Sequence, residues 1–211
     1  MKDIVIIGSG GFAKEVAFLI DEINRNKKEW NLLGFIDEKT GEYNGKYKII
    51  NNDSWLEKID EEIFIVFGIG NPALIKKLFS KFNKNLNIKF PNLIHPNVIG
   101  DWERIKIGVG NIICAGNIFT TDIKIGSFNI FNLSCTIGHD SEIGSFNVIN
   151  PTVNISGGVK LHDEILIGTG AQVLQYVEIV DNTTIGAGAV VVKSIVESGV
   201  YIGAPAKKLI K

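Results

Sequence analysis

The sequence predicts two units in series, a small parallel α/β unit followed by a parallel β-helix. Glycine-rich turns after short buried strands indicate the first unit, and an unbroken six-residue repeat of apolar residues indicates the second. The segment from Pro91 to Pro96 separates the two patterns. We therefore expect domains at residues 1–92 and 93–211, the second including a C-terminal tail.

The first unit begins with a buried strand at residues 3–7, a glycine-rich turn, and a helix that extends to about residue 24. The turn, residues 8–13, has the pattern Gly-x-Gly-x-x-Ala. Its glycines permit a tight turn and leave the amides of the helix N-terminus open to phosphate oxygens.

Two further strands, 32–36 and 63–67, end in an acidic pair and in a second glycine-rich turn before another helix. Ligands of parallel sheets bind beyond the carboxyl ends of the strands, so these features indicate a Rossmann-like nucleotide-binding domain. The unit ends before a second mononucleotide half, which favours a nucleoside diphosphate over a dinucleotide. The expected ligand contacts are Gly8, Ser9, Gly10, Asp37, Glu38 and Gly70.

From residue 107 an apolar residue recurs at every sixth position: Ile107, Ile113, Phe119, Ile125, Phe131, Ile137, Ile143, Ile149, Ile155, Leu161, Ile167, Val173, Ile179, Ile185 and Val191. This period is typical of a short strand plus a corner. Three such units close one triangular coil, so residues eighteen apart should stack along the axis and fill the interior.

Two neighbouring positions of the repeat are also regular. The residue after the apolar one is often glycine, or asparagine at Asn132 and Asn150, so we expect positive φ or close approach of the next coil there. The residue two before it is often small or β-branched: Cys135, Ser141, Val153, Val159, Ala171, Thr183 and Ala189.

Composition excludes several classes of function. The 22 basic and 23 acidic residues give a net charge of −1, which disfavours nucleic-acid or anionic-membrane binding. No apolar run reaches 18 residues, and residues 1–3 lead directly into a strand, so we expect a cytoplasmic protein. Cys114 and Cys135 have no metal-ligand spacing and are expected to be buried thiols.

The three histidines differ in their surroundings. His139 lies two residues after the inward-facing Ile137 and beside Asp140, so its ring should project from an edge of the prism as an acid-oriented general base. His95 precedes Pro96 and is interpreted as structural. His162 lies at a corner, where either solvation or contact with substrate is possible.

Six motifs occur in the same order as in a known family: the turn at 8–11, Gly34-Phe35-Ile36-Asp37-Glu38, Gly68-Ile69-Gly70-Asn71, Leu93-Ile94-His95-Pro96, Gly138-His139-Asp140 and Gly203-Ala204-Pro205-Ala206-Lys207. Over essentially its whole length the chain resembles the bacterial hexapeptide-repeat sugar acyltransferases. These include N-acetyltransferases of 4-amino-4,6-dideoxy nucleotide sugars and sialic acid O-acetyltransferases.

The resemblance implies a left-handed β-helix, a homotrimer and acetyl-CoA as co-substrate. It assigns His139 as the catalytic base and Asp140 as the acid that raises its basicity, with Asp140 shorter than the glutamate of some relatives. It also implies that Gly157 N–H meets the thioester oxygen in a groove between subunits, and that Thr169 and Ala187 line the pantetheine arm. Val148 replaces a histidine that some relatives use against coenzyme A.

The sequence therefore predicts an acetyl-CoA-dependent N-acetyltransferase of a nucleotide-linked 4-amino-4,6-dideoxy sugar in surface-glycan biosynthesis, with direct transfer and without a metal. The alternative within the family is O-acetylation of a sialic-acid-type sugar. A β-helix carbonic anhydrase is disfavoured because His139 and His162 are 23 residues apart rather than closely paired. A non-catalytic sugar-nucleotide sensor is a further alternative that binding of coenzyme A would exclude.

Overall fold

The computed structural model describes residues 1–210. The chain divides into two compact units, Met1–Pro96 and a second that begins at Asn97. The division falls at the end of the proline-flanked segment that follows the first unit. Within residues 1–210, the helices are too short and too polar for any of them to span a bilayer.

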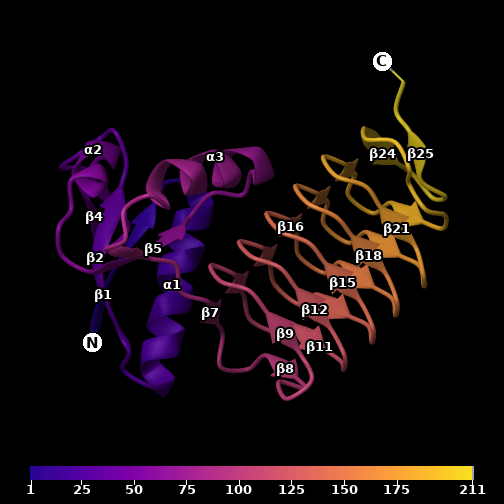
Figure 1. Cartoon of the computed structure of the whole chain (residues 1–211), viewed down its shortest axis with the longest axis horizontal. Coiled ribbons are helices and arrows are strands. Elements are labelled where there is room, and N and C mark those ends of the chain that lie inside the picture. Colours follow the sequence, from indigo (N-terminus) through magenta and orange to yellow (C-terminus); the bar gives the residue numbers. More distant parts are fainter. Residues whose placement is uncertain (211) are drawn as a thin grey trace. The chain divides into compact units, whose positions relative to one another are not determined.

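The first unit is a parallel sheet with helices (Figure 1). Its elements are β1 (Lys2–Ile7), α1 (Gly11–Asn26), β2 (Trp30–Ile36), β3 (Tyr43–Asn44), β4 (Tyr47–Asn51), α2 (Asp53–Glu57), β5 (Ile63–Phe67), α3 (Pro72–Phe82), β6 (Ile88–Lys89) and β7 (Leu93–Ile94). The sheet order is β3-β4-β2-β1-β5-β6. All its pairs are parallel except the β3–β4 hairpin.

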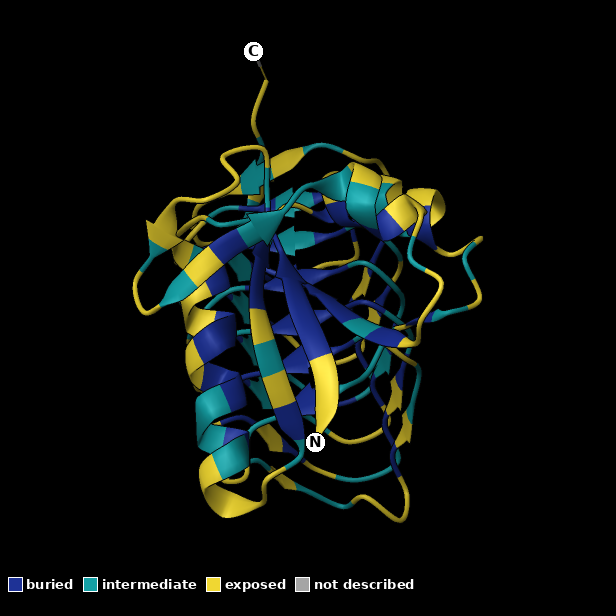
Figure 2. Ribbon diagram, turned by 90° about the vertical axis from the view of Figure 1, so that its left-hand side faces the viewer, coloured by how far each residue is buried: buried dark blue, intermediate teal, exposed yellow. Residues whose placement is uncertain are grey.

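Burial in the first unit follows the sequence pattern. The last four residues of β1 are buried, as in a central strand covered on both faces. Helix α1 buries Ala13, Val16, Leu19, Ile20 and Ile23 at helical spacing, so buried and exposed segments alternate along its ribbon in Figure 2. Helix α3 begins after Asn71, whose side chain accepts a hydrogen bond from Leu74 N–H.

The β3–β4 hairpin and α2 are additional to the strands and helices that the sequence pattern predicts. The hairpin contacts the glycine-rich turn, because Asn44 Nδ2 donates a hydrogen bond to Ser9 O. Helix α2 is capped by Asn52, whose side chain accepts from Ser54 N–H. These elements extend the sheet beyond β2 without interrupting the predicted strands.

The second unit is a parallel β-helix with three faces (Figure 1). The first face contains β10 (Ile112–Ile113), β13 (Ile130–Phe131), β16 (Val148–Ile149), β19 (Leu166–Ile167), β22 (Thr184–Ile185), β24 (Val200–Ile202) and β25 (Lys207–Lys208). The second contains β8 (Ile99–Gly100), β11 (Ile118–Phe119), β14 (Thr136–Ile137), β17 (Asn154–Ile155), β20 (Gln172–Val173) and β23 (Val190–Val191). The third contains β9 (Lys106–Ile107), β12 (Lys124–Ile125), β15 (Glu142–Ile143), β18 (Lys160–Leu161) and β21 (Glu178–Ile179).

The eighteen-residue stacking predicted from the repeat is confirmed. Ile125 pairs with Ile107 on one side and with Ile143 on the other, and Leu161 pairs with Ile143 and Ile179. All repeat residues from Ile113 to Val191 are buried. Ile107 is half-buried because β9 is the end strand of its face and has a neighbour on one side only.

The left-handed corners do not lie where the sequence pattern placed them. Positive φ occurs three residues after the inward apolar residue, for example at Phe128, Asp140 and Thr152, and not at Asn132 or Asn150. At the corners from Phe128 to Asn182 the backbone N–H donates to a carbonyl of the previous coil, as Asp140 N–H does to Thr121 O. This bond between coils holds non-glycine residues in a conformation that they otherwise avoid.

The glycines that follow the apolar residues have a different role, close approach of coils. A Cβ on Gly126 would lie 2.6 Å from Gly144 O, and one on Gly138 would lie 2.5 Å from Gly157 N. Neither glycine has positive φ. Of the two reasons proposed from the sequence, close approach of the next coil is therefore the one that applies here.

Buried polar side chains line the inner corners. Asn129 N–H and Nδ2 donate to Asn111 Oδ1, and Asn147 N–H donates to Asn129 Oδ1, which forms a ladder along the axis. The ladder also satisfies corner carbonyls, since Asn129 Nδ2 donates to Gly144 O over 2.8 Å. Cys114 and Cys135 are buried free thiols, and burial raises the pKa of Cys135 to about 11.

Candidate functional site

All six predicted nucleotide contacts line one cavity of about 530 Å³ in the first unit: Gly8, Ser9, Gly10, Asp37, Glu38 and Gly70. The cavity lies beyond the carboxyl ends of β1, β2 and β5, as expected for a parallel sheet. Ile69, from the second glycine-rich turn, also lines it, as do Asp53, Leu74 and Leu78, which the sequence pattern did not single out. The leucines come from α3 and supply an apolar wall that a nucleobase could contact.

One of the two acidic side chains after β2, that of Asp37, is already hydrogen-bonded within the protein. Ser9 Oγ donates to Asp37 Oδ2 over 2.6 Å, and Glu38 N–H donates to Asp37 Oδ1 over 2.7 Å. Asp37 therefore holds the glycine-rich turn against the end of β2. Glu38 is exposed, so its carboxylate is the more available of the two for a ribose or a base.

Among residues 1–210, no lysine or arginine lines this cavity. The backbone amides at the start of α1 are therefore the donors that a phosphate group would meet here. A Cβ on Gly10 would meet no protein atom within 4 Å, and the φ of Gly10 is −75°. The protein itself therefore does not require glycine at this position. Gly8 differs, because its φ is +94° and a Cβ would lie 3.0 Å from the Ile69 side chain.

In the second unit His139 and Asp140 form a hydrogen-bonded pair at one corner of the β-helix. His139 Nδ1 is 2.7 Å from Asp140 Oδ2, and both side chains are at least half exposed. Asp140 has a φ of 59°, the left-handed conformation of this corner. A carboxylate that accepts from Nδ1–H leaves Nε2 as the proton acceptor, which is the form required of a general base.

Gly157 lies directly beneath the imidazole of His139. A Cβ at residue 157 would lie 2.6 Å from His139 Nε2 and 2.7 Å from His139 Cε1. His139 O also accepts a hydrogen bond of 2.7 Å from Gly158 N–H, so the two coils are tied at this corner. Glycine is needed at residue 157 because any side chain there would displace the ring.

The predicted coenzyme residues are divided between two corners. His139 and Gly157 share the corner that joins the second and third faces, whereas Thr169 and Ala187 lie at the corner that joins the first and second. Thr169 O accepts from Gly188 N–H over 2.8 Å, so Thr169 and Ala187 lie on adjacent coils. The resemblance places Gly157 in a groove between subunits, and in this structure Gly157 lies against His139 of the same chain.

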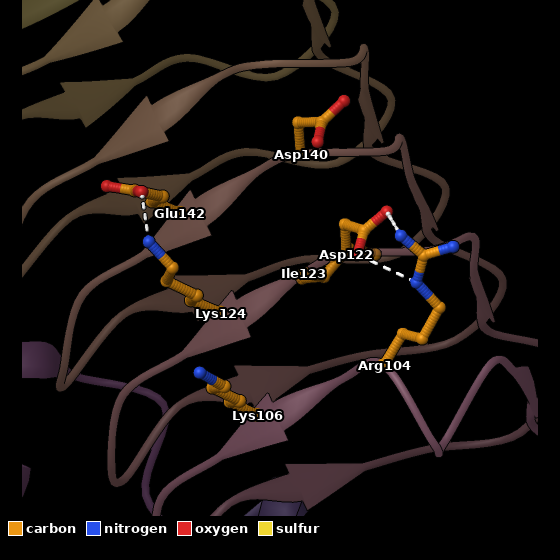
Figure 3. A pocket seen from close by; sticks show the side chains of 7 residues that line it. All are labelled: Arg104, Lys106, Asp122, Ile123, Lys124, Asp140 and Glu142. Atoms are coloured by element: carbon orange, nitrogen blue, oxygen red, sulfur yellow. Dashed lines mark hydrogen bonds and ion pairs between the residues drawn. The ribbon is translucent and has the colours of Figure 1, made fainter.

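A charged hollow of about 490 Å³ lies on the third face beside Asp140 (Figure 3). Its walls carry two ion pairs, Arg104–Asp122 at 2.6 Å and Lys124–Glu142 at 2.7 Å. The Lys124 pair lowers the pKa of Glu142 from its usual value. These partners are eighteen residues apart, so the repeat itself contained the signal that could have located them.

The remaining residues of interest lie elsewhere. Val148 is 2% exposed on the first face, away from the corner of His139. His162 Nε2 is 2.7 Å from Glu178 Oε1, and both side chains are about half exposed. His95 lies in the segment before Asn97. Residues 1–210 contain no group of three or more His, Cys, Asp or Glu side chains placed to bind a metal ion.

Comparison with protein families identifies the first unit. Residues 3–82 match the model of the PglD N-terminal domain. A search of curated proteins found no significant match to the chain.

Solved structures match both units together. A histidine-to-asparagine variant of perosamine N-acetyltransferase from Caulobacter crescentus, in complex with CoA and GDP-perosamine, is 26% identical, with a TM-score of 0.91 over 100% of this chain and 98% of that one. The acetyltransferase domain of PglB from Neisseria gonorrhoeae, in complex with acetyl coenzyme A, is 29% identical, with a TM-score of 0.89 and 99% of each chain covered. WeeI from Acinetobacter baumannii is 28% identical, with a TM-score of 0.88 over 99% of this chain and 100% of that one.

Proposed function

We propose that this chain N-acetylates the amino group of a nucleotide-linked 4-amino-4,6-dideoxy sugar. The chain is an acyl-CoA-dependent acyltransferase of the bacterial hexapeptide-repeat sugar acyltransferase family, with a left-handed β-helix. The observation that carries the proposal is the His139–Asp140 pair seated on Gly157, in a chain that matches such N-acetyltransferases over its whole length. One of these matches is described with CoA and a GDP-linked sugar.

In the proposed reaction His139 Nε2 removes a proton from the sugar ammonium or the attacking amine. Asp140 keeps the proton of the ring on Nδ1 and stabilises the imidazolium that forms. The amine nitrogen forms a bond to the thioester carbonyl carbon and the C–S bond breaks. The proton that His139 takes from the nitrogen as it attacks then passes to the departing thiolate, which leaves as the free thiol. If the acceptor enters as the ammonium, its additional proton is released to solvent, so charge balances over the cycle.

Gly157 N–H is the proposed oxyanion donor. Among residues 1–210 this amide donates to no protein acceptor, and it lies beside the ring of His139. A donor placed where negative charge develops stabilises the transition state more than the ground state. Thr169 and Ala187, at the other edge of the second face, would contact the pantetheine arm of the coenzyme.

The proposal also assigns the domains. Residues 1–92 would bind the nucleotide diphosphate through Gly8, Ser9, Gly10, Asp37, Glu38 and Gly70, and residues 93–211 would carry out transfer. The molecule would act as a homotrimer in the cytoplasm, and its product would serve surface-glycan biosynthesis. Neither a metal ion nor a covalent acyl-enzyme is needed in this scheme.

The experiment that tests the function is a transfer assay with acetyl-CoA and GDP-, UDP- and dTDP-linked 4-amino-4,6-dideoxy sugars, measured as thiol release. The matched 4-hydroxy sugars and a CMP-linked sialic acid serve as controls. We expect turnover only with an amino sugar. Transfer to the hydroxyl acceptors instead would favour sugar O-acetylation, and binding of nucleotide sugar without any binding of coenzyme A would favour a sensor.

A further inference from the structure

At the corner that bears His139, one inward-facing position of the repeat carries a polar side chain, whereas the equivalent positions of the other coils carry apolar ones. In successive coils this position is occupied by Ile105, Ile123, Ser141, Val159, Val177 and Ile195, all buried. Ser141 is the polar member of the column and is 0% exposed. The single hydroxyl therefore lies inside the prism at the coil that carries the proposed base.

The Ser141 hydroxyl contacts the two backbone segments that carry the proposed catalytic groups. Its Oγ donates to Gly138 O over 2.8 Å and is 3.3 Å from Ser156 O. The first carbonyl belongs to the peptide that leads into His139, and the second belongs to the peptide whose N–H is that of Gly157. One hydroxyl proton is thus shared between the two coils at this corner.

Peptide geometry gives this contact a consequence at the outer surface. A trans peptide is planar, so its carbonyl and its N–H point in opposite directions. A hydroxyl that holds Ser156 O toward the interior therefore directs Gly157 N–H outward, beside the ring of His139. A hydrogen bond to the carbonyl also polarises the peptide and strengthens its N–H as a donor.

We propose that Ser141 is a positioning residue that keeps the ring of His139 and the amide of Gly157 in register across two coils. The proposal rests on the function assigned to His139 and Gly157 above. Ser141 touches no substrate and acts only through the two peptides that its hydroxyl binds.

A purely structural role explains the column less well. Polar inner residues do bind carbonyls at other corners, as Cys135 Sγ does with Asn150 O at 3.2 Å. However, Val159 and Val177 occupy the same position as Ser141 in the next two coils, and both are buried without a polar group. The β-helix therefore forms this corner with valine, and folding alone does not require the hydroxyl.

The column supplies a matched pair of variants, Ser141→Val and Ser141→Thr. They have nearly the same shape and differ in the presence of the hydroxyl. Thr183→Val is the control, because Thr183 is also buried and its Oγ1 is 3.5 Å from a corner carbonyl, that of Asp181, at a corner without His139. All three proteins are compared with the wild type in Tm, in transfer kinetics and by NMR.

We expect Ser141→Val to lower kcat about tenfold, with the KM for acetyl-CoA within about twofold, because misplacement of reacting groups acts on the transition state. Ser141→Thr should restore kcat, and Thr183→Val should leave it unchanged. A kcat for Ser141→Val equal to that of the wild type would overturn the proposal. An equal loss of kcat in Thr183→Val would also overturn it, because the effect would then be general to buried hydroxyls.

NMR separates this proposal from the proposed function. The chain has three histidines, so the ring signal of His139 can be assigned by substitution and followed together with the amide signal of Gly157. Both signals should shift in Ser141→Val and return in Ser141→Thr. If the wild type transfers no acetyl group to any acceptor, the proposed function fails and these signals alone decide the positioning role; unchanged signals would reject it.

Discussion

At the residue scale, the properties of His139 depend on the backbone of its neighbour. Asp140 occupies a left-handed corner, and this conformation lets adjacent side chains meet at 2.7 Å. The sequence predicted the pair because a histidine and a carboxylate follow an inward residue at corner spacing. It did not predict the ring's seat on Gly157, because the eighteen-residue stacking was applied only to the inward apolar residues, although His139 and Gly157 are also eighteen apart.

The first prediction concerns the general base. His139→Ala should lower kcat by about 10²- to 10⁴-fold, because proton transfer from the amine is lost. Binding of the nucleotide sugar, measured by calorimetry, should not change, since its site lies in the first unit. Asp140→Asn should cost less than His139→Ala. Near wild-type turnover of His139→Ala with a confirmed substrate would show that another group is the base.

The second prediction concerns the seat of the ring. Gly157→Ala adds one carbon where His139 Nε2 lies 2.6 Å away, so the ring must move. We expect kcat to fall about 10- to 100-fold, since displacement of about 1 Å can have this effect. The matched control is Gly126→Ala, where a Cβ would also meet the next coil, 2.6 Å from Gly144 O, but at a corner without His139, so kcat should not change. A crystal structure of Gly157→Ala with an unmoved imidazole would contradict the explanation.

At the element scale, the six-residue period predicted the coils of the β-helix but not the polar side chains buried inside them. The small and β-branched residues that precede the inward apolar residue by two positions, such as Val153, Ala171 and Ala189, are buried as well. The asparagine ladder was missed because the apolar pattern treats a polar residue as outward-facing. Asn111, Asn129 and Asn147 are eighteen apart, and this repetition of one polar residue at the coil period is the signal that reveals such a ladder.

The third prediction tests that ladder. Asn129→Leu leaves Gly144 O and Asn147 N–H without their partner inside the β-helix. Orphaned buried groups cost about 1–3 kcal/mol each, so the loss of two partners should lower the free energy of unfolding in urea by about 2–6 kcal/mol. Asn154→Ala is the control, because Asn154 also bridges two side chains but is only half-buried. Equal losses in both variants would mean that burial does not determine the cost.

At the scale of the whole molecule, the proposed nucleotide and transfer sites belong to different units. The parallel strands and glycine-rich turns of the first unit were predicted correctly, since their local turn chemistry is explicit in the sequence. The β3–β4 hairpin was not, because residues 43–51 lack a strong alternating pattern and are held by long-range contacts such as Asn44 with Ser9. The cavity residues Leu74 and Leu78 were missed although their helix was predicted, because the helical pattern does not show which leucines face the ligand cavity.

The fourth prediction tests the independence of the units. Gly10→Val should abolish binding of the nucleotide sugar, because its side chain would occupy the space in front of the first amides of α1. Coenzyme A binding and Tm should remain those of the wild type, since a Cβ at residue 10 meets no protein atom. Calorimetry with each ligand separately distinguishes the two effects. Loss of coenzyme A binding as well would show that the sites are coupled.

The last prediction concerns assembly. Light scattering should give three times the chain mass of 23.1 kDa. Because Gly157 lies against His139 of its own chain while Thr169 and Ala187 lie at another corner, a shared site would combine His139 and Gly157 of one subunit with Ala187 of its neighbour. A ring with one repeated heterologous contact permits this arrangement.

Mixed trimers test that arrangement directly. Co-assembly of His139→Ala with Ala187→Phe subunits in equal amounts should restore about a quarter of wild-type activity, because each site draws from two chains at random. His139→Ala mixed with Gly157→Ala should restore none, since those residues come from one chain and every site then carries a defect. Recovery in the second mixture would contradict the corner geometry, and a fully active monomer would exclude a site shared between subunits.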